Sequence, residues 1–358
     1  MPHLPSPRTR ILSGICLLAL GSVACGHDES PLSTSTAGSA TNAAGEPGTN
    51  QEPGGGAANA GGAGNTGGAS ANTGGSTMNS SIDPTSPDEV LFQDAQAAYN
   101  AMDFTTADQK FQQLVTDYPD SPRVDNATYL LARIDYRLDD FPTAITEFTD
   151  FIAAFPDSLF IDDAHYYLAR SQYQTADYQS AIPNFQQSLI VDAAGTYSDN
   201  AQYFLARSYY ELLDYVNAGT EFAKFEATYP DSTYIDNSGY YWGRTEFDQG
   251  NLQSAMPHFE AVLGFAGGSI YADDATYYLG RCDYGLGQLA DASTQFETLL
   301  NDFPASQYAD NSLYYLVRVA VDGADCVAAQ SHLDELTMTH AASPEIPLAQ
   351  TYMTNNGC

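Results

Sequence analysis

The chain has 358 residues, with 45 acidic side chains against 12 basic ones and a formal net charge of −33. This length is enough for two or more average domains. The charge excludes a nucleic-acid binder built on a basic surface, because phosphate contacts need clustered Lys and Arg. It also argues against direct adhesion to anionic lipid.

The first 24 residues have the features of an export signal. Arg8 and Arg10 precede a short apolar run, "ILSGICLLALGSVA", which is too short for a spanning helix and ends directly before Cys25. We therefore predict that residues 1–24 are removed as a signal peptide. Loss of the two arginines changes the net charge from −33 to −35 in the mature chain.

The end of this signal resembles that of bacterial lipoproteins, in which a Cys after small residues is acylated and becomes the mature N-terminus. Val23, Ala24 and Cys25 fit the pattern, whereas Ser22 stands where the family usually has Leu. The resemblance implies lipidation of Cys25. Because Gly26 and not Asp follows, it also implies an outer membrane lipoprotein that faces the periplasm, with secretion or a cell-surface location as the alternatives.

Residues 25–86 have the composition of a flexible tether. After Cys25 they consist largely of Gly, Ala, Ser, Thr, Asn and Pro, as in "GGGAANAGGAGNTGGASANTGGS". Such a segment has almost no apolar side chains to bury and cannot offset the entropy of ordering. We expect the folded part of the chain to begin at residue 87.

From residue 87 to residue 343 the sequence repeats every 37 residues without an insertion. Four columns of residues show this period, and each keeps its spacing along the array. The columns are Arg133, Arg170, Arg207, Arg244, Arg281 and Arg318; Tyr129, Tyr166, Tyr203, Tyr240, Tyr277 and Tyr314; Ala107, Ala144, Ala181, Ala218, Ala255, Ala292 and Ala329; and Phe111, Phe148, Phe185, Phe222, Phe259 and Phe296. A fixed period of this length indicates stacked repeats.

Each repeat contains two amphipathic segments. The first runs like residues 125–138 and starts at an Asp-Asn pair, Asp125 and Asn126, that can cap a helix. The second runs like residues 142–154, with Pro142 in the first turn and Pro156 beyond its end. A lone helical hairpin cannot bury its apolar face, but stacked hairpins can. The sequence predicts an all-α solenoid of about seven helix-turn-helix repeats over residues 87–343, followed by a tail over residues 344–358.

The repeats resemble the tetratricopeptide family. Ala132, Ala144, Phe148 and Pro156 stand at that family's spacing of small, Ala, aromatic and Pro positions, although the period is 37 instead of 34. The variant is similar to repeats of bacterial envelope proteins, notably the Tol-Pal-associated cell division coordinator and the outer-membrane lipoprotein of the β-barrel assembly machinery. The resemblance implies a concave groove, lined by the first helices, that takes extended or helical peptides.

A row of Tyr and Arg side chains forms the candidate binding site. In the first helix of a repeat, Tyr129, Arg133 and Tyr136 share one face at helical spacing, and Ala127 and Ile134 share the opposite face. The corresponding residues, which we call the Tyr/Arg ladder, are Tyr129, Arg133, Tyr136, Tyr166, Arg170, Tyr173, Tyr203, Arg207, Tyr210, Tyr240, Arg244, Tyr277 and Arg281.

The placement of the basic residues supports a binding role for this ladder. Of the ten basic residues left after loss of the signal, six belong to the Arg column. We hypothesise that the ladder holds an acidic or C-terminal peptide segment, since Arg pairs with carboxylates and Tyr offers flat contact area. The alternative is structural, with each Arg paired to an acid of the neighbouring repeat and each Tyr packed between repeats.

Three cysteines follow the tether, in a compartment that we expect to be oxidising. The simplest arrangement joins Cys326 to Cys358 and leaves Cys282 packed as a small apolar side chain. Three pairings are open, because any two of the three cysteines could combine.

The sequence contains no pattern that indicates catalysis, a cofactor or a metal site. His165, His258, His332 and His340 lie in no metal spacing and no triad arrangement, and the glycine runs of the tether form no phosphate-binding loop. We therefore expect a non-enzymatic scaffold that binds envelope proteins or their peptide segments and acts in envelope integrity, division or assembly. The alternatives are a component of outer-membrane protein assembly and a peptidoglycan- or carbohydrate-binding module.

Overall fold

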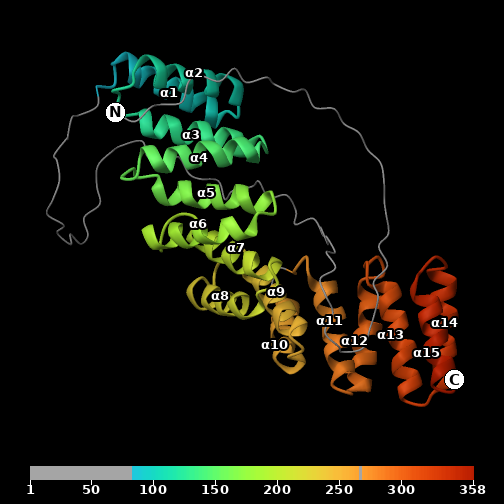
Figure 1. The fold of residues 1–358 in the computed structure, drawn as a ribbon. Helices are drawn as coiled ribbons and strands as arrows, with labels where there is room; N and C mark the ends of the chain where they lie inside the picture. The colour runs from blue at the N-terminus through green and yellow to red at the C-terminus, as the bar shows by residue number, and fades with distance from the viewer. Residues whose placement is uncertain (1–82, 266–267) are drawn as a thin grey trace. The chain divides into compact units, whose positions relative to one another are not determined.

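The computed structural model describes residues 83–265 and 268–358, and within these ranges the chain forms only α-helices (Figure 1). The helices are α1 (Pro87–Asn100), α2 (Phe104–Asp117), α3 (Val124–Arg137), α4 (Phe141–Ala154), α5 (Ile161–Gln174), α6 (Tyr178–Val191), α7 (Ser198–Glu211), α8 (Tyr215–Thr228), α9 (Ile235–Asp248), α10 (Leu252–Leu263), α11 (Ala272–Gly285), α12 (Leu289–Asp302), α13 (Ala309–Asp322), α14 (Cys326–Thr339) and α15 (Glu345–Asn355). The predicted signal peptide, Cys25 and the tether as far as residue 82 lie outside the described residues.

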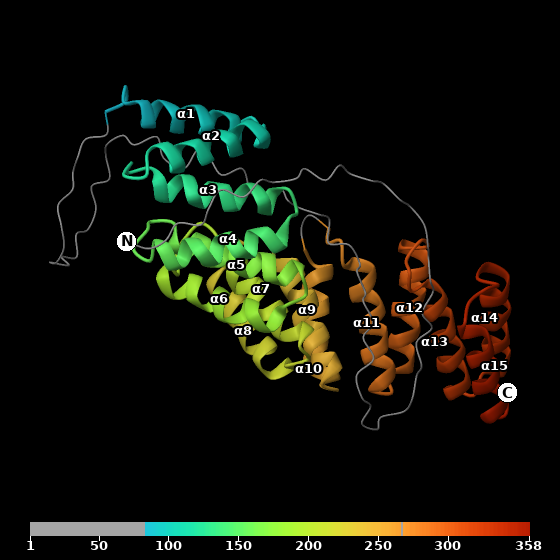
Figure 2. The ribbon, with the colours of Figure 1, turned by 45° about the horizontal axis from the view of Figure 1, so that its top comes forward.

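The described chain divides into two compact units, and the division falls within α3. The first unit contains residues 83–127 and 137–139, where α1 packs against α2. The second contains residues 128–136 and 140–358, where each helix from α4 to α15 packs against the next. Figure 2 shows these helices as a succession of hairpins.

The 37-residue period of the sequence is also the period of the helices. The first helices of successive repeats, from α3 to α13, begin 37 residues apart, and so do the second helices from α2 to α14. The segments predicted over residues 125–138 and 142–154 correspond to α3 and α4, each of which begins one residue earlier than expected. The predicted all-α repeat solenoid is confirmed.

First and second helices are buried to different degrees. In α7, every residue from Ala201 to Ser208 is buried, whereas α8 buries only Ala218, Phe222 and Phe225. A helix that is buried on all sides belongs to the core, and one with a single buried stripe covers it. The first helices therefore form the interior of the array, and the Ala and Phe columns of the second helices pack onto them.

Small residues allow the two helices of a repeat to approach closely. The position of Ala132 is taken by Gly280 in α11, where a Cβ atom would lie 2.8 Å from the ring of Phe296. Such a distance is shorter than any normal carbon–carbon contact, so the ring occupies the space that a side chain would need. The first helix therefore needs a small residue here to receive the aromatic ring of the second helix.

The starts of the first helices differ from the prediction. Asp125 was expected to cap its helix, but α3 begins at Val124, so Asp125 lies in the first turn. In the following repeats the N-cap residue is aromatic and makes no side-chain capping bond; these residues are Phe160, Tyr197, Tyr234, Tyr271 and Tyr308. Each ring stacks on a Tyr of the preceding repeat, as Tyr197 does on Tyr166 with centroids 4.7 Å apart. Packing between repeats thus determines the residue at this position.

Hydrogen bonds between Ser and Asp join successive repeats. A Ser in the turn before a first helix donates its hydroxyl to the Asp that lies 33 residues earlier. The pairs are Ser121 with Asp88 (2.6 Å), Ser232 with Asp199 (2.7 Å), Ser269 with Asp236 (2.8 Å) and Ser343 with Asp310 (2.9 Å). The same hydroxyl also accepts a backbone N–H two residues later, as in Ser232 with Tyr234.

The last helix, α15, lies within the segment predicted as a tail over residues 344–358. It packs against α13 and α14, and Ala349 and Met353 are buried in the core. A disulfide joins Cys326, the first residue of α14, to Cys358. Cys282 is a free and buried thiol. No helix in the described ranges is long and apolar enough to cross a membrane.

The Ser–Asp bonds lead to a stability prediction at the one place where Gly replaces the Ser. A Cβ atom on Gly195 would lie 3.0 Å from Asp162 Oδ2. We expect Gly195→Ser to form the missing bond and to raise the free energy of unfolding by about 1 kcal/mol in urea denaturation. Ser232→Ala should lower it by a similar amount. Gly195→Ala controls for the loss of backbone freedom, and a Ser variant no more stable than this Ala variant would contradict the prediction.

Candidate functional site

The structure brings the Tyr/Arg ladder together within the second unit. Each first helix from α3 to α11 contributes one Tyr of the buried column, the Arg one turn later and an aromatic residue one further turn on. Because the helices start at a constant interval, these side chains recur at equivalent positions along the first helix of each repeat.

Each ladder Arg stacks on an aromatic ring of the next repeat, 34 residues later. The guanidinium carbon of Arg170 lies 3.4 Å from the ring centroid of Phe204, and that of Arg207 lies 3.5 Å from Tyr241. The other pairs are Arg133 with Tyr167 (4.7 Å), Arg244 with Tyr278 (4.2 Å), Arg281 with Tyr315 (5.3 Å) and Arg318 with Tyr352 (4.9 Å). A contact of this kind contributes roughly 0.5–2 kcal/mol, with the larger values where water is excluded.

This second aromatic column was missed by the sequence analysis. From Tyr167 to Tyr315 its members directly follow a Tyr of the first column, as Tyr167 follows Tyr166, and they keep the same period. The signal was therefore present in the sequence. A helical wheel places adjacent residues about 100° apart, so the face that contains Tyr166 does not include its neighbour.

The ladder tyrosines of the first column lie inside the array and not on an open groove. Tyr203 is fully buried, and the side chains at positions 129, 166, 240 and 277 are at most 5% exposed. Their rings contact neighbouring rings, as Tyr240 does by stacking on Tyr271 at 4.4 Å and by an edge-to-face contact with Tyr241 at 4.9 Å. These ring faces are therefore covered, which favours the packing interpretation for this column.

The second ladder Tyr of each repeat packs toward the Arg of the next one. Tyr136 is buried, whereas Tyr173 and Tyr210 are only half-buried. At the equivalent positions further along, Phe247 lies 5.0 Å from the guanidinium of Arg281, and Tyr284 lies 4.8 Å from that of Arg318. At these two junctions the Arg lies between aromatic rings of both neighbouring repeats.

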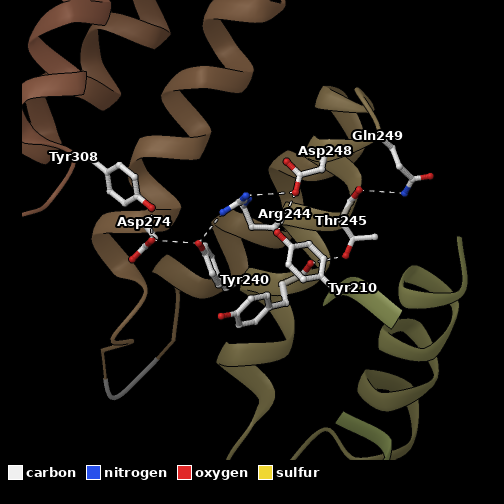
Figure 3. Close-up of polar contacts among 9 residues, drawn as sticks. Tyr210, Tyr240, Arg244, Thr245, Asp248, Gln249, Asp274 and Tyr308 are labelled. Carbon is white, nitrogen blue, oxygen red and sulfur yellow. Dashed lines mark hydrogen bonds and ion pairs between the residues drawn. The ribbon is translucent and has the colours of Figure 1, made fainter. Parts of the chain in front are cut away.

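Arg207 and Arg244 also pair with acids on their own helices. Arg207 donates to Glu211 at 2.9 Å, and Arg244 contacts Asp248 at 3.4 Å. The structural alternative had expected such acids on the neighbouring repeat; in these two pairs the acid lies one turn further along the same helix. Figure 3 shows Arg244 between Asp248 and the hydroxyl of Tyr240, which accepts a hydrogen bond from the guanidinium at 3.2 Å.

A buried acid, Asp274 in the first turn of α11, lies beside the ladder. It is 8% exposed and accepts hydrogen bonds from Tyr308 Oη at 2.9 Å and Tyr240 Oη at 3.2 Å (Figure 3). Burial raises the pKa of this carboxyl to about 6, because desolvation penalises the charged form more than the hydrogen bonds favour it. Asn stands at the equivalent positions 200, 237 and 311.

The raised pKa of Asp274 predicts that the ionised carboxylate lowers the free energy of unfolding at neutral pH, and that Asn at this position would remove the loss. Near pH 3 the carboxyl is largely protonated in both the folded and the unfolded state, so its burial carries no desolvation penalty for a charge. As the pH rises from about 4 to 6, the unfolded state ionises more readily than the folded state, and the folded state loses stability. We expect the free energy of unfolding of Asp274→Asn to exceed that of the wild type by up to about 3 kcal/mol at pH 8. This difference in free energy should decrease toward zero near pH 4.

Urea denaturation at a series of pH values tests this expectation. Asp150→Asn removes the same charge from an exposed position of α4 and serves as the control. An equal gap with the same pH dependence in that control would assign the effect to net charge and contradict the role of burial.

The described residues contain no group of three or more His, Cys, Asp or Glu side chains placed to hold a metal ion. Two of the histidines have structural surroundings. His165 Nδ1 lies 3.1 Å from Asn184 Oδ1, and His258 stacks on Trp242 with centroids 3.9 Å apart. Burial lowers the pKa of both imidazoles.

Comparison with solved structures supports the repeat fold. The C-terminal part of a tetratricopeptide repeat-containing protein from Cytophaga hutchinsonii superimposes with a TM-score of 0.58 at 14% identity, over 72% of this chain and 98% of that one. A tetratricopeptide repeat protein from Parabacteroides merdae superimposes with a TM-score of 0.47 at 13% identity, over 75% of this chain and 98% of that one. PilF of Pseudomonas aeruginosa superimposes with a TM-score of 0.46 at 16% identity, over 63% of this chain and 96% of that one.

Comparison of sequences identifies the family. No curated protein sequence matches the chain significantly. The profile of the YfiO family, described as outer membrane lipoprotein, matches residues 84–175 and 162–313 and so covers most of the array. Proteins with this type of repeat fold are generally non-catalytic scaffolds that bind segments of other proteins. With its repeats matched over this length, the chain belongs to the YfiO family of outer membrane lipoproteins.

Proposed function

We propose that the protein is an exported scaffold, anchored in the outer membrane through a lipid on Cys25, that binds other envelope proteins. The membership of residues 84–313 in a family of outer membrane lipoproteins is the observation that carries this proposal. The N-terminal signal and the Cys after Val23 and Ala24 agree with it. A role in envelope integrity, division or assembly follows from that location.

We propose that the arginines of the ladder provide the binding site. Carboxylates bind a guanidinium through its N–H edge and not through the faces that stacking covers. The Arg244 side chain is 18% exposed, whereas Arg170 and Arg207 are 9% and 6% exposed, and the half-buried Tyr173 and Tyr210 lie in the same row. Partner segments rich in Asp or Glu, or ending in a free carboxylate, are the chemistry that fits this edge.

A component of outer-membrane protein assembly is a second candidate function, and the family match favours it. Carbohydrate binding through the ladder has less support, since sugar recognition by tyrosines needs free ring faces and the first-column rings are covered. Sedimentation with purified cell wall distinguishes a peptidoglycan binder from a protein binder.

The ladder proposal predicts that an added acid will block binding without disturbing the fold. Gln174 is exposed and lies one turn after Arg170, at the position that Glu211 occupies relative to Arg207. We expect Gln174→Glu to reduce capture of partner proteins from an envelope fraction several-fold, because the new carboxylate competes for the guanidinium. The bait is the mature chain, and mass spectrometry identifies and quantifies the captured proteins.

Gln253→Glu makes the same charge change at an exposed position of α10 and is the matched control. Equal capture by the wild type and both variants would place the binding site outside the ladder. Equal loss in both variants would indicate a general effect of charge.

The proposed lipidation of Cys25 predicts a specific labelling pattern in cells. The wild type and Cys16→Ala should incorporate a palmitate analogue and partition into the detergent phase, since Cys16 lies within the cleaved signal. Cys25→Ala should incorporate none and appear in the aqueous phase. Label that persists in Cys25→Ala would refute the lipid anchor while leaving the binding site untested.

A further inference from the structure

The helix α15 occupies the place of the first helix of an eighth repeat. Ser343 donates to Asp310 over the same 33 residues that separate the other Ser–Asp pairs. Asn311 Nδ2 donates to Glu345 Oε1 at 3.0 Å, and Asn237, two repeat periods earlier, contacts Tyr271 over the same 34 residues. The helix therefore docks through the junction that full repeats use.

This helix also completes the Arg–aromatic row at its end of the second unit. The ring of Tyr352 lies 4.9 Å from the guanidinium carbon of Arg318, and its hydroxyl donates to Asp322 at 2.6 Å. Ala349 and Met353 are its buried apolar side chains. An eleven-residue helix is marginal in isolation, so α15 depends on these few contacts and on its covalent link.

The disulfide that holds α15 is accessible to reagents in solution. Cys326 begins α14, Cys358 follows α15, and both residues are exposed. The link closes a loop between residues that are 32 positions apart. Disulfides of this kind shift a folding equilibrium by roughly thirtyfold to a thousandfold.

We infer that the Cys326–Cys358 disulfide is a redox latch on α15, and that a dithiol reductant releases this helix from α13 and α14. A thiolate of the reductant attacks one sulfur of the disulfide and forms a mixed disulfide with it. The second thiol of the reductant then resolves that bond. Two electrons and two protons pass to the protein, which leaves two thiols at positions 326 and 358 and a disulfide in the reductant.

Release of α15 changes the end of the binding surface. Tyr352 no longer covers Arg318, and the core side chains that Ala349 and Met353 contact become accessible. The inference goes beyond the proposed scaffold function, since it concerns the opening of one helix and not the identity of a partner.

The remaining thiol does not interfere with this chemistry. Cys282 is fully buried, and burial raises its pKa to about 12, so almost no thiolate forms near neutral pH. Cys282→Ala therefore leaves the latch unchanged and provides a control.

Hydrogen exchange read by mass spectrometry tests the latch on the mature chain. With dithiothreitol in native buffer, we expect the amides of α15 to exchange at least about thirtyfold faster, while those of α7 to α11 keep their rates. Cys358→Ser should reproduce this result without reductant, and Cys282→Ala should behave as the wild type in both conditions.

Three results would overturn the inference. The first is unchanged protection of α15 in Cys358→Ser or after reduction. The second is loss of protection along the whole array, which would make the disulfide a global support. The third is a disulfide that reacts with dithiothreitol only in denaturant. Each can be read without a binding partner, so failure here is distinct from failure of the proposed function.

Discussion

The stacking of a guanidinium on an aromatic ring of the next repeat is the contact on which the array depends. It occurs at the same place in six successive junctions, from Arg133 with Tyr167 to Arg318 with Tyr352. The pairing of residues 34 apart requires that every helix start in register, so the absence of insertions in the sequence follows from it. The aromatic N-caps stack in that same register, as Tyr308 does on Tyr277 with centroids 4.3 Å apart.

This use of arginine also explains how so acidic a chain keeps buried cations. Guanidinium groups are always protonated and weakly hydrated, so burial beneath a ring costs less than for an ammonium group. Six of the ten basic side chains of the mature protein stand in this Arg column, where Arg170 and Arg207 are buried and the other four are half-buried. A chain of this net charge resists nonspecific association with nucleic acid and favours solubility at high local concentration.

The period and the alternation of helices could be predicted from the sequence because they depend on residues that repeat at one interval. The predicted starts of α3 and α4 were wrong by one residue, and α4 is capped by Asp140, which accepts a hydrogen bond from the backbone N–H of Thr143. In α5 the stacked Phe160 takes the N-cap position, and Asp162 lies in the first turn. The burial of Tyr203 could not be predicted from its own helix. A helical wheel shows which side chains share a face, but rings from other segments cover this face, such as Phe225 of α8 and Tyr234 of the next repeat.

The tight turn between the two helices of a repeat places one residue in the left-handed region at every occurrence, from Met102 to Ala324. Because the turns share one conformation and the junctions share one register, the gene can lose or gain whole units of 37 codons without a change of reading frame or of helix register. Excision of residues 198–234 would bring Tyr241 to the place of Phe204, above Arg170. The number of repeats is therefore a trait that recombination within the gene can alter, whereas the contacts within each repeat persist.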